Sequence, residues 1–489
     1  MCPGISRRCF LRTTAVGVVS YGAMATLAER LSTAGAAAAA ANQSKVRVGK
    51  VYVGLTQANW PTPTVDLGAE VKRFEAQLAG LQPALADVEF VEAGVVSDDK
   101  QLAQAKEKLT QVDGILVIHL TLHTGPLIKG LLDLNRPVMV FTMPYHGHEW
   151  HTIAGLQREG KLIDILPSSR YEDLAEAIRP FRAIHRLKEA RILHVNYSEA
   201  DPAYCQAIQA KFGTRIVSLK LEDLQKAYDE ADEAELQADA DRWMREAEKI
   251  VEPTREDILK GSRMYIAMKN LLAQHQAVAI TMNCLGMGLI DKGMGYPCLG
   301  FVRLNNALQA GVCEADLKST LTQLIFTYLV GRTGFVTDPV FDYSNSTIIH
   351  AHCVAATRME GPDRPTAAYH MRTHLEDNRG VSLQVRMPVG GKISMARLIG
   401  TDLMLFSTGE AVDSPFVDRA CRTKLTTKVE NIEQFLENWS CGLHRVVFYG
   451  DHTRDLRRFC RLTKIRLLRE GIDDLQNVPG LEWEPNVHA

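Results

Sequence analysis

Short runs of β-branched and apolar residues alternate with longer amphipathic stretches from Val46 onward, and this alternation constrains the fold most strongly. The apolar runs include VRVGKVYVGL, VEFVEAGVV, GILVIHLTL and PVMVFTMPY, separated by stretches such as VKRFEAQLAGLQPAL and DDKQLAQAKEKLT. Strands of about five to eight residues that alternate with helices are typical of a parallel sheet covered by helices. No GxGxxG sequence opens a helix here, so a dinucleotide-binding domain has no support.

A second unit of the same kind begins near Ala190, where ARILHVN, RIVSL and AVAITMNC are predicted to be buried strands. An acidic helix is expected over roughly 231–251, and its charges indicate a solvated face. From about Pro339 the pattern changes. Apolar and polar residues alternate in GVSLQVRM, KISMARLIG and DLMLFSTGEAV, and Gly and Pro residues separate these segments. This pattern is typical of an antiparallel, barrel-like β region. The segment RDLRRFCRLTKIRLLREG predicts a closing helix.

The chain of 489 residues is therefore predicted to be α/β, with two Rossmann-like parallel-sheet domains followed by a C-terminal antiparallel β-barrel-like domain. We predict a signal and linker at 1–44, an N-terminal α/β domain at 45–187, a central α/β domain at 188–338 and a β-rich domain at 339–489. A formal net charge of −2 gives no basic face, so a nucleic-acid partner is not expected.

The N-terminus carries twin arginines, Arg7 and Arg8, followed by an apolar run of small residues and an alanine-rich segment. This resembles a twin-arginine export signal with a cleavage region near residues 36–42. The alternative is a single membrane anchor, but the apolar run is short and is broken by Glu29 and Arg30. We expect export to the periplasm or another extracytoplasmic space with no membrane span after signal removal, or a cytoplasmic protein if the signal is not used.

Eight cysteines follow the predicted signal, and none forms a CxxC pair. An exported protein admits disulfides. Proteins exported by the twin-arginine route are expected to fold before they leave the cytoplasm. The cysteines are therefore interpreted as buried free thiols rather than as disulfides. Cys313, Cys353 and Cys441 each lie within three residues of a candidate site residue described next. A cysteine nucleophile in an exported hydrolase is the alternative to packing thiols.

Two carboxylates, Glu314 and Asp316, stand where a glycine-rich apolar run turns into a predicted helix. Acidic residues in a first helical turn are common because they complement the helix dipole. The alternative is a metal site, since Asp338 follows a probable strand, His352 precedes Cys353 in IHAHC, and His444 opens a strand in GLHRVVFYGDH. A hard divalent cation takes carboxylate oxygens and an imidazole and leaves positions for water or substrate. Such distant ligands converge only through the fold.

The motifs PCLGFVRLNNAL, CEADL, GFVTDPVFD, IHAHC and GLHRVVFYGDH resemble the L-fucose isomerase and L-arabinose isomerase superfamily, especially its fucose isomerase-like proteins. The resemblance covers about residues 46–475. It implies two Rossmann-like domains, a β-barrel domain, a homo-oligomer (trimer or hexamer) and a divalent metal, usually Mn²⁺, with Mg²⁺ or Co²⁺ as alternatives. It also implies that Glu314, Asp338 and His444 hold the metal, with His352 close to the substrate or acting as a further ligand.

The same resemblance implies aldose–ketose isomerisation through an ene-diol, with Glu314 and Asp338 exchanging the proton between C1 and C2 of the sugar. Asp316 cannot share the direction of Glu314 on a helix, so it is interpreted as a helix-start or supporting residue. Leu443 stands where relatives commonly carry Asn, and Arg445 stands where arabinose isomerases carry a second His. The sugar is therefore not identified by the sequence.

Further substrate-binding or supporting residues are expected at Asn283, where a strand ends, and at Arg303 and Asn305, which orient sugar hydroxyls or cap a turn. The loop PYHGHEWH follows another strand and contains His146, His148 and Trp150. Imidazoles beside an aromatic ring suit sugar recognition, and in the family first-domain loops reach the active site of a neighbouring subunit. A polar surface loop is the alternative, and a second metal site is disfavoured.

The helical metal-pair spacing in HMRTH lacks the Glu of HExxH, so a zinc protease is disfavoured. The sequence thus favours a metal-dependent sugar isomerase. The main alternative is a non-catalytic exported sugar-binding or sensing protein with the same fold, because export is unusual for an isomerase of central metabolism.

Overall fold

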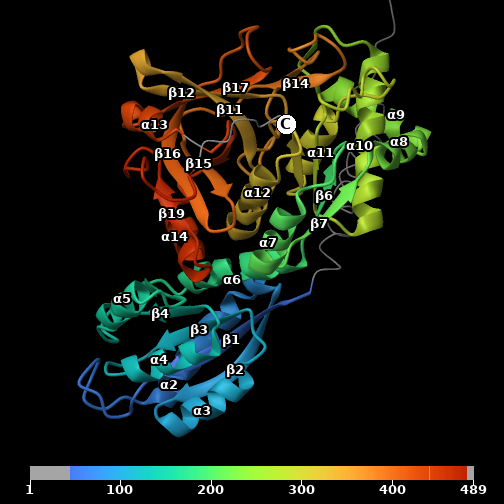
Figure 1. The fold of residues 1–489 in the computed structure, drawn as a ribbon. Coiled ribbons are helices and arrows are strands. Elements are labelled where there is room, and N and C mark those ends of the chain that lie inside the picture. The colour runs from blue at the N-terminus through green and yellow to red at the C-terminus, as the bar shows by residue number, and fades with distance from the viewer. Residues whose placement is uncertain (1–43, 440, 482–489) are drawn as a thin grey trace, which may run out of the picture. The chain divides into compact units, whose positions relative to one another are not determined.

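The computed structural model describes residues 44–439 and 441–481 (Figure 1). The predicted signal and linker at 1–44 lie, apart from their last residue, outside the described residues. Within the described ranges, no helix combines the length and the apolar character that crossing a membrane requires.

The first sheet has five parallel strands in the order β2-β1-β3-β4-β5. The strands β3 (Gly114–His119) and β4 (Val138–Thr142) are buried along their whole length, because helices cover both faces of the sheet. The remaining elements are β1 (Val46–Val53), β2 (Val88–Val96), β5 (Ile163–Pro167), α2 (Leu67–Gly80), α3 (Asp99–Lys108), α4 (Gly125–Leu131), α5 (Trp150–Arg158), α6 (Asp173–Glu189), and the 3-10 turns η1 (Gln82–Leu85) and η2 (Leu132–Leu134).

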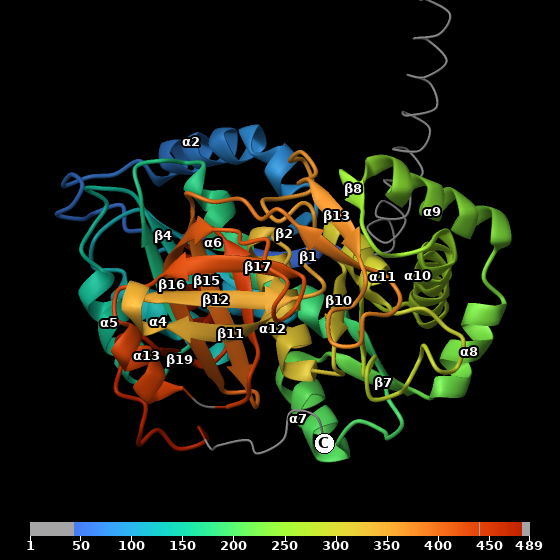
Figure 2. The ribbon, with the colours of Figure 1, turned by 90° about the horizontal axis from the view of Figure 1, so that it is seen from above.

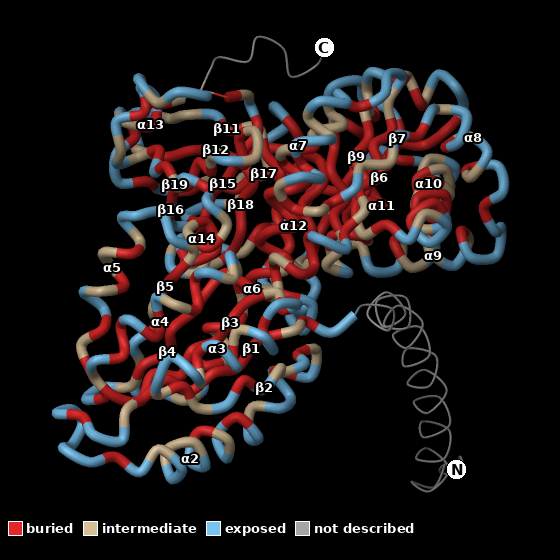
Figure 3. The backbone as a smooth tube through the Cα atoms, turned by 60° about the horizontal axis from the view of Figure 1, so that its bottom comes forward, coloured by how far each residue is buried: buried red, intermediate tan, exposed pale blue. Residues whose placement is uncertain are grey.

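The second sheet has four parallel strands in the order β10-β9-β6-β7. Its strands are β6 (Arg191–Val195), β7 (Arg215–Leu219), β9 (Ala279–Met282) and β10 (Ala310–Cys313). Its helices are α7 (Pro202–Phe212), α8 (Leu221–Asp229), α9 (Glu233–Glu246), α10 (Arg255–His275), α11 (Cys298–Asn306) and α12 (Leu317–Val330). In Figure 3 the buried residues gather along the strands, while the outer helices and loops carry the exposed ones.

The C-terminal region contains a closed antiparallel barrel of six strands in the cyclic order β15-β18-β11-β12-β17-β16 (Figure 2). Closure pairs β15 with β16, so the barrel has no open edge between them. The strands are β11 (Phe335–Asp342), β12 (Thr347–His352), β15 (Lys392–Ile399), β16 (Leu403–Asp413), β17 (Thr423–Lys428) and β18 (Arg445–Tyr449). The predicted α/β class with two parallel sheets and a β-barrel is therefore confirmed.

Smaller elements complete the fold. The short strand β8 (Lys249–Ile250) pairs with β13 (Tyr369–Arg372), which also pairs with β14 (Ser382–Val385). The 3-10 turn η3 (Tyr343–Asn345) joins β11 to β12, and helix α13 (Ile432–Asn438) lies between β17 and β18 in the chain. Helix α12 contacts β9 and β10 of the second sheet and also β15 and β18 of the barrel. Helix α12 therefore packs between the second sheet and the barrel.

Two predicted helices differ from the structure. The acidic helix α9 begins after its Asp232 cap and ends at Glu246, because the chain then becomes extended and forms β8. The closing helix α14 (Thr453–Leu462) is also shorter than predicted, and the chain continues as strand β19 (Arg466–Arg469). A left-handed backbone at Lys464, with φ 55°, ends the helical path, and β19 adds to β16 in parallel.

Strand β11 runs across position 338, where the sequence predicts the boundary between the central and the C-terminal domain. The domain boundaries themselves stay a prediction. The eight cysteines outside residues 1–43 are all free thiols, and seven of them are buried, as predicted.

Candidate metal centre

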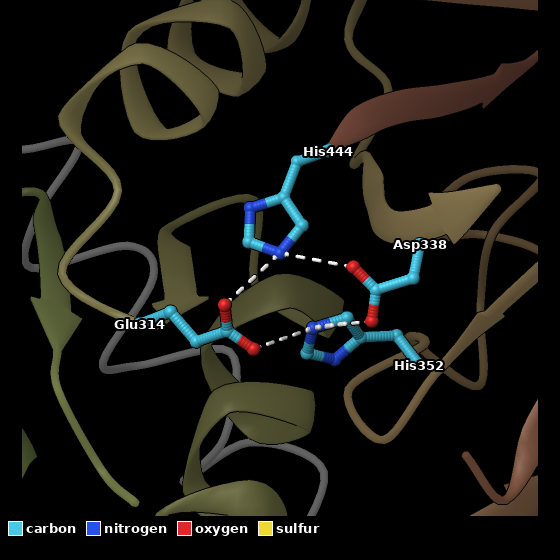
Figure 4. Close-up of side chains that lie close together, drawn as sticks. All are labelled: Glu314, Asp338, His352 and His444. Carbon is cyan, nitrogen blue, oxygen red and sulfur yellow. Dashed lines mark ion pairs between the residues drawn. The ribbon is translucent and has the colours of Figure 1, made fainter. Parts of the chain in front are cut away.

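Four side chains that lie far apart in the sequence meet where the second sheet faces the barrel (Figure 4). Glu314 follows the carboxyl end of β10, the edge at which open parallel sheets bind ligands. Asp338 lies on β11, His352 ends β12, and His444 comes directly before β18. One ligand atom from each of the four lies within 4.8 Å of those of the other three.

The barrel register explains why three of these side chains meet. Asp338 pairs with Ala351 across β11 and β12, which brings it next to His352. Thr337 pairs with Arg445 across β11 and β18, so the next residue along, Asp338, lies beside His444. Asp338 was predicted just after a strand, whereas it lies inside β11, because the strand runs through Pro339 to Asp342.

The turn before α12 explains the direction of Glu314. Glu314 and Ala315 both have left-handed backbones, with φ 64° and 54°. Helix α12 begins only at Leu317, after Asp316 has capped it. The expectation that Glu314 belongs to the first helical turn is therefore wrong: its side chain leaves a tight turn at the end of a strand. Left-handed backbones of non-glycine residues cost roughly 1–2 kcal/mol each, so the surrounding contacts must hold this turn in place.

The distances between the four groups fit one bound cation. His444 Nε2 lies 3.3 Å from Glu314 Oε2 and 3.3 Å from Asp338 Oδ1. His352 Nε2 lies 3.6 Å from Glu314 Oε1 and 4.0 Å from Asp338 Oδ2. Two ligands at about 2.1 Å from one divalent ion are roughly 3.0–3.4 Å apart at octahedral or tetrahedral angles. The four ligand atoms, which lie within 4.8 Å of one another, would therefore have to draw closer together to enclose an ion.

The unsatisfied atoms of the site point to the same interpretation. Among the described residues, Asp338 Oδ1, His352 Nε2 and His444 Nε2 are buried and make no hydrogen bond. Buried polar atoms without a partner are costly, and a cation at the centre of the group would satisfy all three at once. Two carboxylates and two imidazoles form a donor set that suits Mn²⁺, Co²⁺ and similar divalent ions.

Charge coupling within the group shifts the pKa values strongly. Burial raises the pKa of Glu314, but the imidazoles of His352 and His444 outweigh burial and hold the pKa well below its usual range. Burial lowers the pKa of His444, yet Asp316, Asp338 and Glu314 hold that pKa well above its usual range. For His352, burial also lowers the pKa, and Glu314 and Asp338 raise it above the ordinary value. Without a metal ion, protons on the imidazoles balance the negative charge of the carboxylates. A bound metal ion would take the place of these protons.

The two carboxylates are the more exposed side chains of the group. The side chain of Asp338 is 26% exposed and that of Glu314 is 12% exposed. Both histidines are buried, so they support the centre from the protein side. The more exposed members of the group are therefore two acids, and carboxylates can bind a cation and transfer protons.

Three further residues with predicted substrate roles make internal contacts instead. Asn283 accepts a hydrogen bond from the Gly286 amide (3.0 Å) in the turn after β9. Arg303 donates to Asp239 (2.8 Å) and lies over the ring of Trp243. Asn305 is buried and exchanges hydrogen bonds with the Gly311 backbone, which ties α11 to β10. None of the three belongs to the group of four, and their contact with a sugar stays a prediction.

The loop with His146, His148 and Trp150 lies at the carboxyl edge of the first sheet, after β4. His146 Nδ1 lies 2.8 Å from the His119 carbonyl oxygen. The His148 ring packs between Trp60 and Trp150, with centroids 4.7 Å and 5.1 Å away, and Trp150 is half exposed. The loop shares no contact with the group of four in this chain, so its predicted role toward a neighbouring subunit stays a prediction.

Sequence reasoning missed Arg397, a buried residue of β15 that donates to Asp316 (2.8 Å) beside the site. The signal was present, because Arg397 is the charged residue within the apolar run of KISMARLIG. A buried arginine needs an anionic partner, but the sequence does not say which carboxylate faces it.

Comparison with known proteins shows a weak similarity to a sugar isomerase. No protein-family model matches the chain. The chain is 23% identical over 291 residues to sulfoquinovose isomerase from Clostridium sp. (strain MSTE9). The match covers 56% of this chain and 63% of the relative, so it spans less than two thirds of that protein's length. Among solved structures, an ABC transporter solute binding protein from Burkholderia multivorans is 11% identical, covering 59% of this chain and 95% of its own. Its TM-score of 0.18 is too low to carry an argument.

Proposed function

We propose that this protein is a metal-dependent aldose–ketose isomerase of the fucose and arabinose isomerase type. The observation that carries the proposal is the convergence of Glu314, Asp338, His352 and His444 on one small volume. The similarity to a sulfoquinovose isomerase supports the carbohydrate substrate and the isomerase class. Mn²⁺ is the proposed ion, with Mg²⁺ or Co²⁺ as alternatives, because a mixed oxygen and imidazole site accepts several divalent ions.

The buried histidines and the more exposed carboxylates are assigned different roles. His352 and His444 are buried and hold the ion from the protein side. A bound divalent ion polarises the sugar oxygens and stabilises the negative charge that develops during proton transfer. Glu314 and Asp338 are the more exposed members of the group. One carboxylate removes the proton from C2 while the other carboxyl group donates a proton to the carbonyl oxygen O1, which forms the ene-diol. Protonation of C1 and loss of the proton from the C2 hydroxyl then complete the ketose.

The two carboxylates lie in different environments, as an acid–base pair requires. Glu314 is flanked by both imidazoles and is the more buried of the two, whereas Asp338 is the more exposed. Glu314 is therefore the stronger candidate for a carboxylate that stays ionised and accepts the proton. Asp338 is the better placed to exchange protons with water.

A panel of aldoses, sulfoquinovose among them, tests the function with and without a chelator. We expect ketose formation that needs the divalent ion, with solvent deuterium incorporated at C1 of the ketose and, through the reverse reaction, at C2 of the recovered aldose. Glu314→Gln should lose both bound Mn²⁺ and ketose formation, while Asp342→Asn, a carboxylate change outside the group on strand β11, which also carries Asp338, should keep them. Unchanged activity of Glu314→Gln would refute the assignment. Tight sugar binding without metal or turnover would instead identify a sugar-binding protein.

The proposal extends to assembly and location. We propose a homo-oligomer, a trimer or hexamer, and export by the twin-arginine route. Light scattering coupled to size-exclusion chromatography measures the first, and fractionation of cells that express the full chain measures the second.

A further inference from the structure

Asp316 connects the metal centre to the start of helix α12. Its Oδ1 accepts from the Ser319 amide (3.0 Å), which caps the helix, and its Oδ2 accepts from the Ser319 hydroxyl (2.7 Å). The same Oδ2 lies 2.8 Å from Nδ1 of His444. One carboxylate therefore holds a helix start and a histidine that is 128 residues further along the chain.

Arg397 completes this connection from the barrel side. Its guanidinium Nη1 donates to Asp316 Oδ2 (2.8 Å) and to the Ser319 hydroxyl (3.0 Å). Its Nε donates to the carbonyl of Cys441 (2.9 Å), three residues before His444. Cys441 and Gly442 have left-handed backbones, with φ 58° and 85°, so the loop that delivers His444 is tightly curved. Arg397 thus anchors that loop to α12.

These contacts determine which nitrogen of His444 faces the centre. When Nδ1 donates its proton to Asp316, the Nε2 lone pair is left on the side of Glu314 and Asp338. Asp316 directly follows the left-handed turn of Glu314 and Ala315, so its contacts with Ser319 and Arg397 also fix the end of that turn. Asp316 and Arg397 are both buried, with side chains 6% and 2% exposed, and their charges compensate each other.

We propose that Asp316 and Arg397 act together as a positioning pair for the metal centre. They set the tautomer and direction of His444 and hold the turn that carries Glu314, and neither touches the ion. The inference rests on the proposed metal site. It assigns the pair a function beyond helix capping: the pair links ligands from the second sheet and from the barrel.

The test uses Asp316→Asn in the full-length protein. Asparagine keeps a carbonyl oxygen that can cap α12, but it loses the charge and the second acceptor oxygen that His444 and Arg397 share. With Mn²⁺ alone as the probe, we expect the dissociation constant to rise about 10–100-fold, the range found when supporting contacts of metal ligands are removed. The electron paramagnetic resonance spectrum of the bound Mn²⁺ should also change, because the direction of His444 changes.

Two control variants separate positioning from stability. Ser319→Ala removes the hydroxyl contacts and keeps the carboxylate on His444, so its Mn²⁺ spectrum should match that of the wild type. Asp232→Asn alters the matching cap of α9, which has no contact with the site, and should leave Mn²⁺ binding unchanged. If Asp316→Asn does not fold, Arg397→Lys replaces it, because lysine keeps the charge but cannot donate to both Asp316 and the Cys441 carbonyl.

Two failures are distinguishable. If the wild-type protein binds no Mn²⁺, the proposed metal site falls, and the positioning pair falls with it. If the wild type binds Mn²⁺, Glu314→Gln abolishes binding, and a folded Asp316→Asn or Arg397→Lys retains wild-type affinity and spectrum, the metal site stands and the positioning role is refuted.

Discussion

Adding Mn²⁺ to metal-free protein should raise the thermal unfolding temperature by an amount that the structure sets. The four ligand groups meet only in the folded chain, because five of the six barrel strands lie between Glu314 and His444 in the sequence. The unfolded chain therefore binds the ion weakly, and nearly all of the binding energy stabilises the fold. At a free Mn²⁺ concentration of a hundred times the dissociation constant, the stabilisation is about 2.7 kcal/mol.

The expected temperature shift follows from the size of the protein. The entropy of unfolding is about 2.1 cal/mol/K per residue, which is roughly 0.9 kcal/mol/K for the roughly 440 residues that the structure describes. A gain of about 2.7 kcal/mol then corresponds to a shift of about 3 °C. If Glu314→Gln weakens binding a hundredfold, the same Mn²⁺ concentration yields only about 0.4 kcal/mol, a shift of under about 1 °C.

Differential scanning fluorimetry at pH 7 measures both shifts after the protein has been stripped with a chelator and dialysed. Asp342→Asn is the matched control, since it changes a carboxylate on β11, the strand of Asp338, without altering the group of four, and it should keep the full shift. The reasoning is refuted if saturating Mn²⁺ moves the wild type by less than about 1 °C. It is equally refuted if Glu314→Gln shifts as far as the wild type, because the ion then binds elsewhere.

Two further predictions concern stability away from the ion. Arg445 and Glu470 form an ion pair in which both side chains are 1% exposed, so Glu470→Gln, which leaves a buried charge without its partner, should cost roughly 3–5 kcal/mol in urea unfolding. Asp473→Asn, at the partly exposed pair with Arg469, should cost no more than about 1 kcal/mol, and equal costs for the two variants would contradict this account. Burial lowers the pKa of His119 from 6.5 to about 4, so the unfolded chain binds that proton first and stability falls as the pH drops from about 6.5 towards 4. Between pH 7 and pH 5 this group contributes a loss of roughly 2 kcal/mol, which His119→Gln should remove; equal losses in the wild type and His119→Gln would show that His119 is not responsible.

The strands of the two parallel sheets were predictable because their signal is local. Strands covered on both faces are apolar throughout, and GILVIHLTL and PVMVFTMPY contain the fully buried strands β3 and β4. The alternation in KISMARLIG and DLMLFSTGEAV likewise identified two barrel strands. The strand β19 was missed because its basic residues continue a helical pattern, and only pairing with β16 makes it a strand.

The residues of the candidate site were visible in the sequence as motifs, but their geometry was not. The sequence named Glu314, Asp338, His352 and His444, and it placed Asp316 at a helix start. It could not show that Glu314 leaves a left-handed turn rather than a helix, because that conformation depends on how the turn is anchored. The partner of Arg397 was equally invisible, since it lies 81 residues away in the chain.

The sequence by itself thus determined the local elements, the α/β class and the acidic and imidazole side chains available for chemistry. Only the tertiary structure decided that these side chains meet. Local periodicity encodes which residues are buried in a strand or helix, because neighbours in the chain share that geometry. Convergence of the site depends on barrel register and closure and on the packing of α12 between sheet and barrel, and these are contacts between residues distant in the chain.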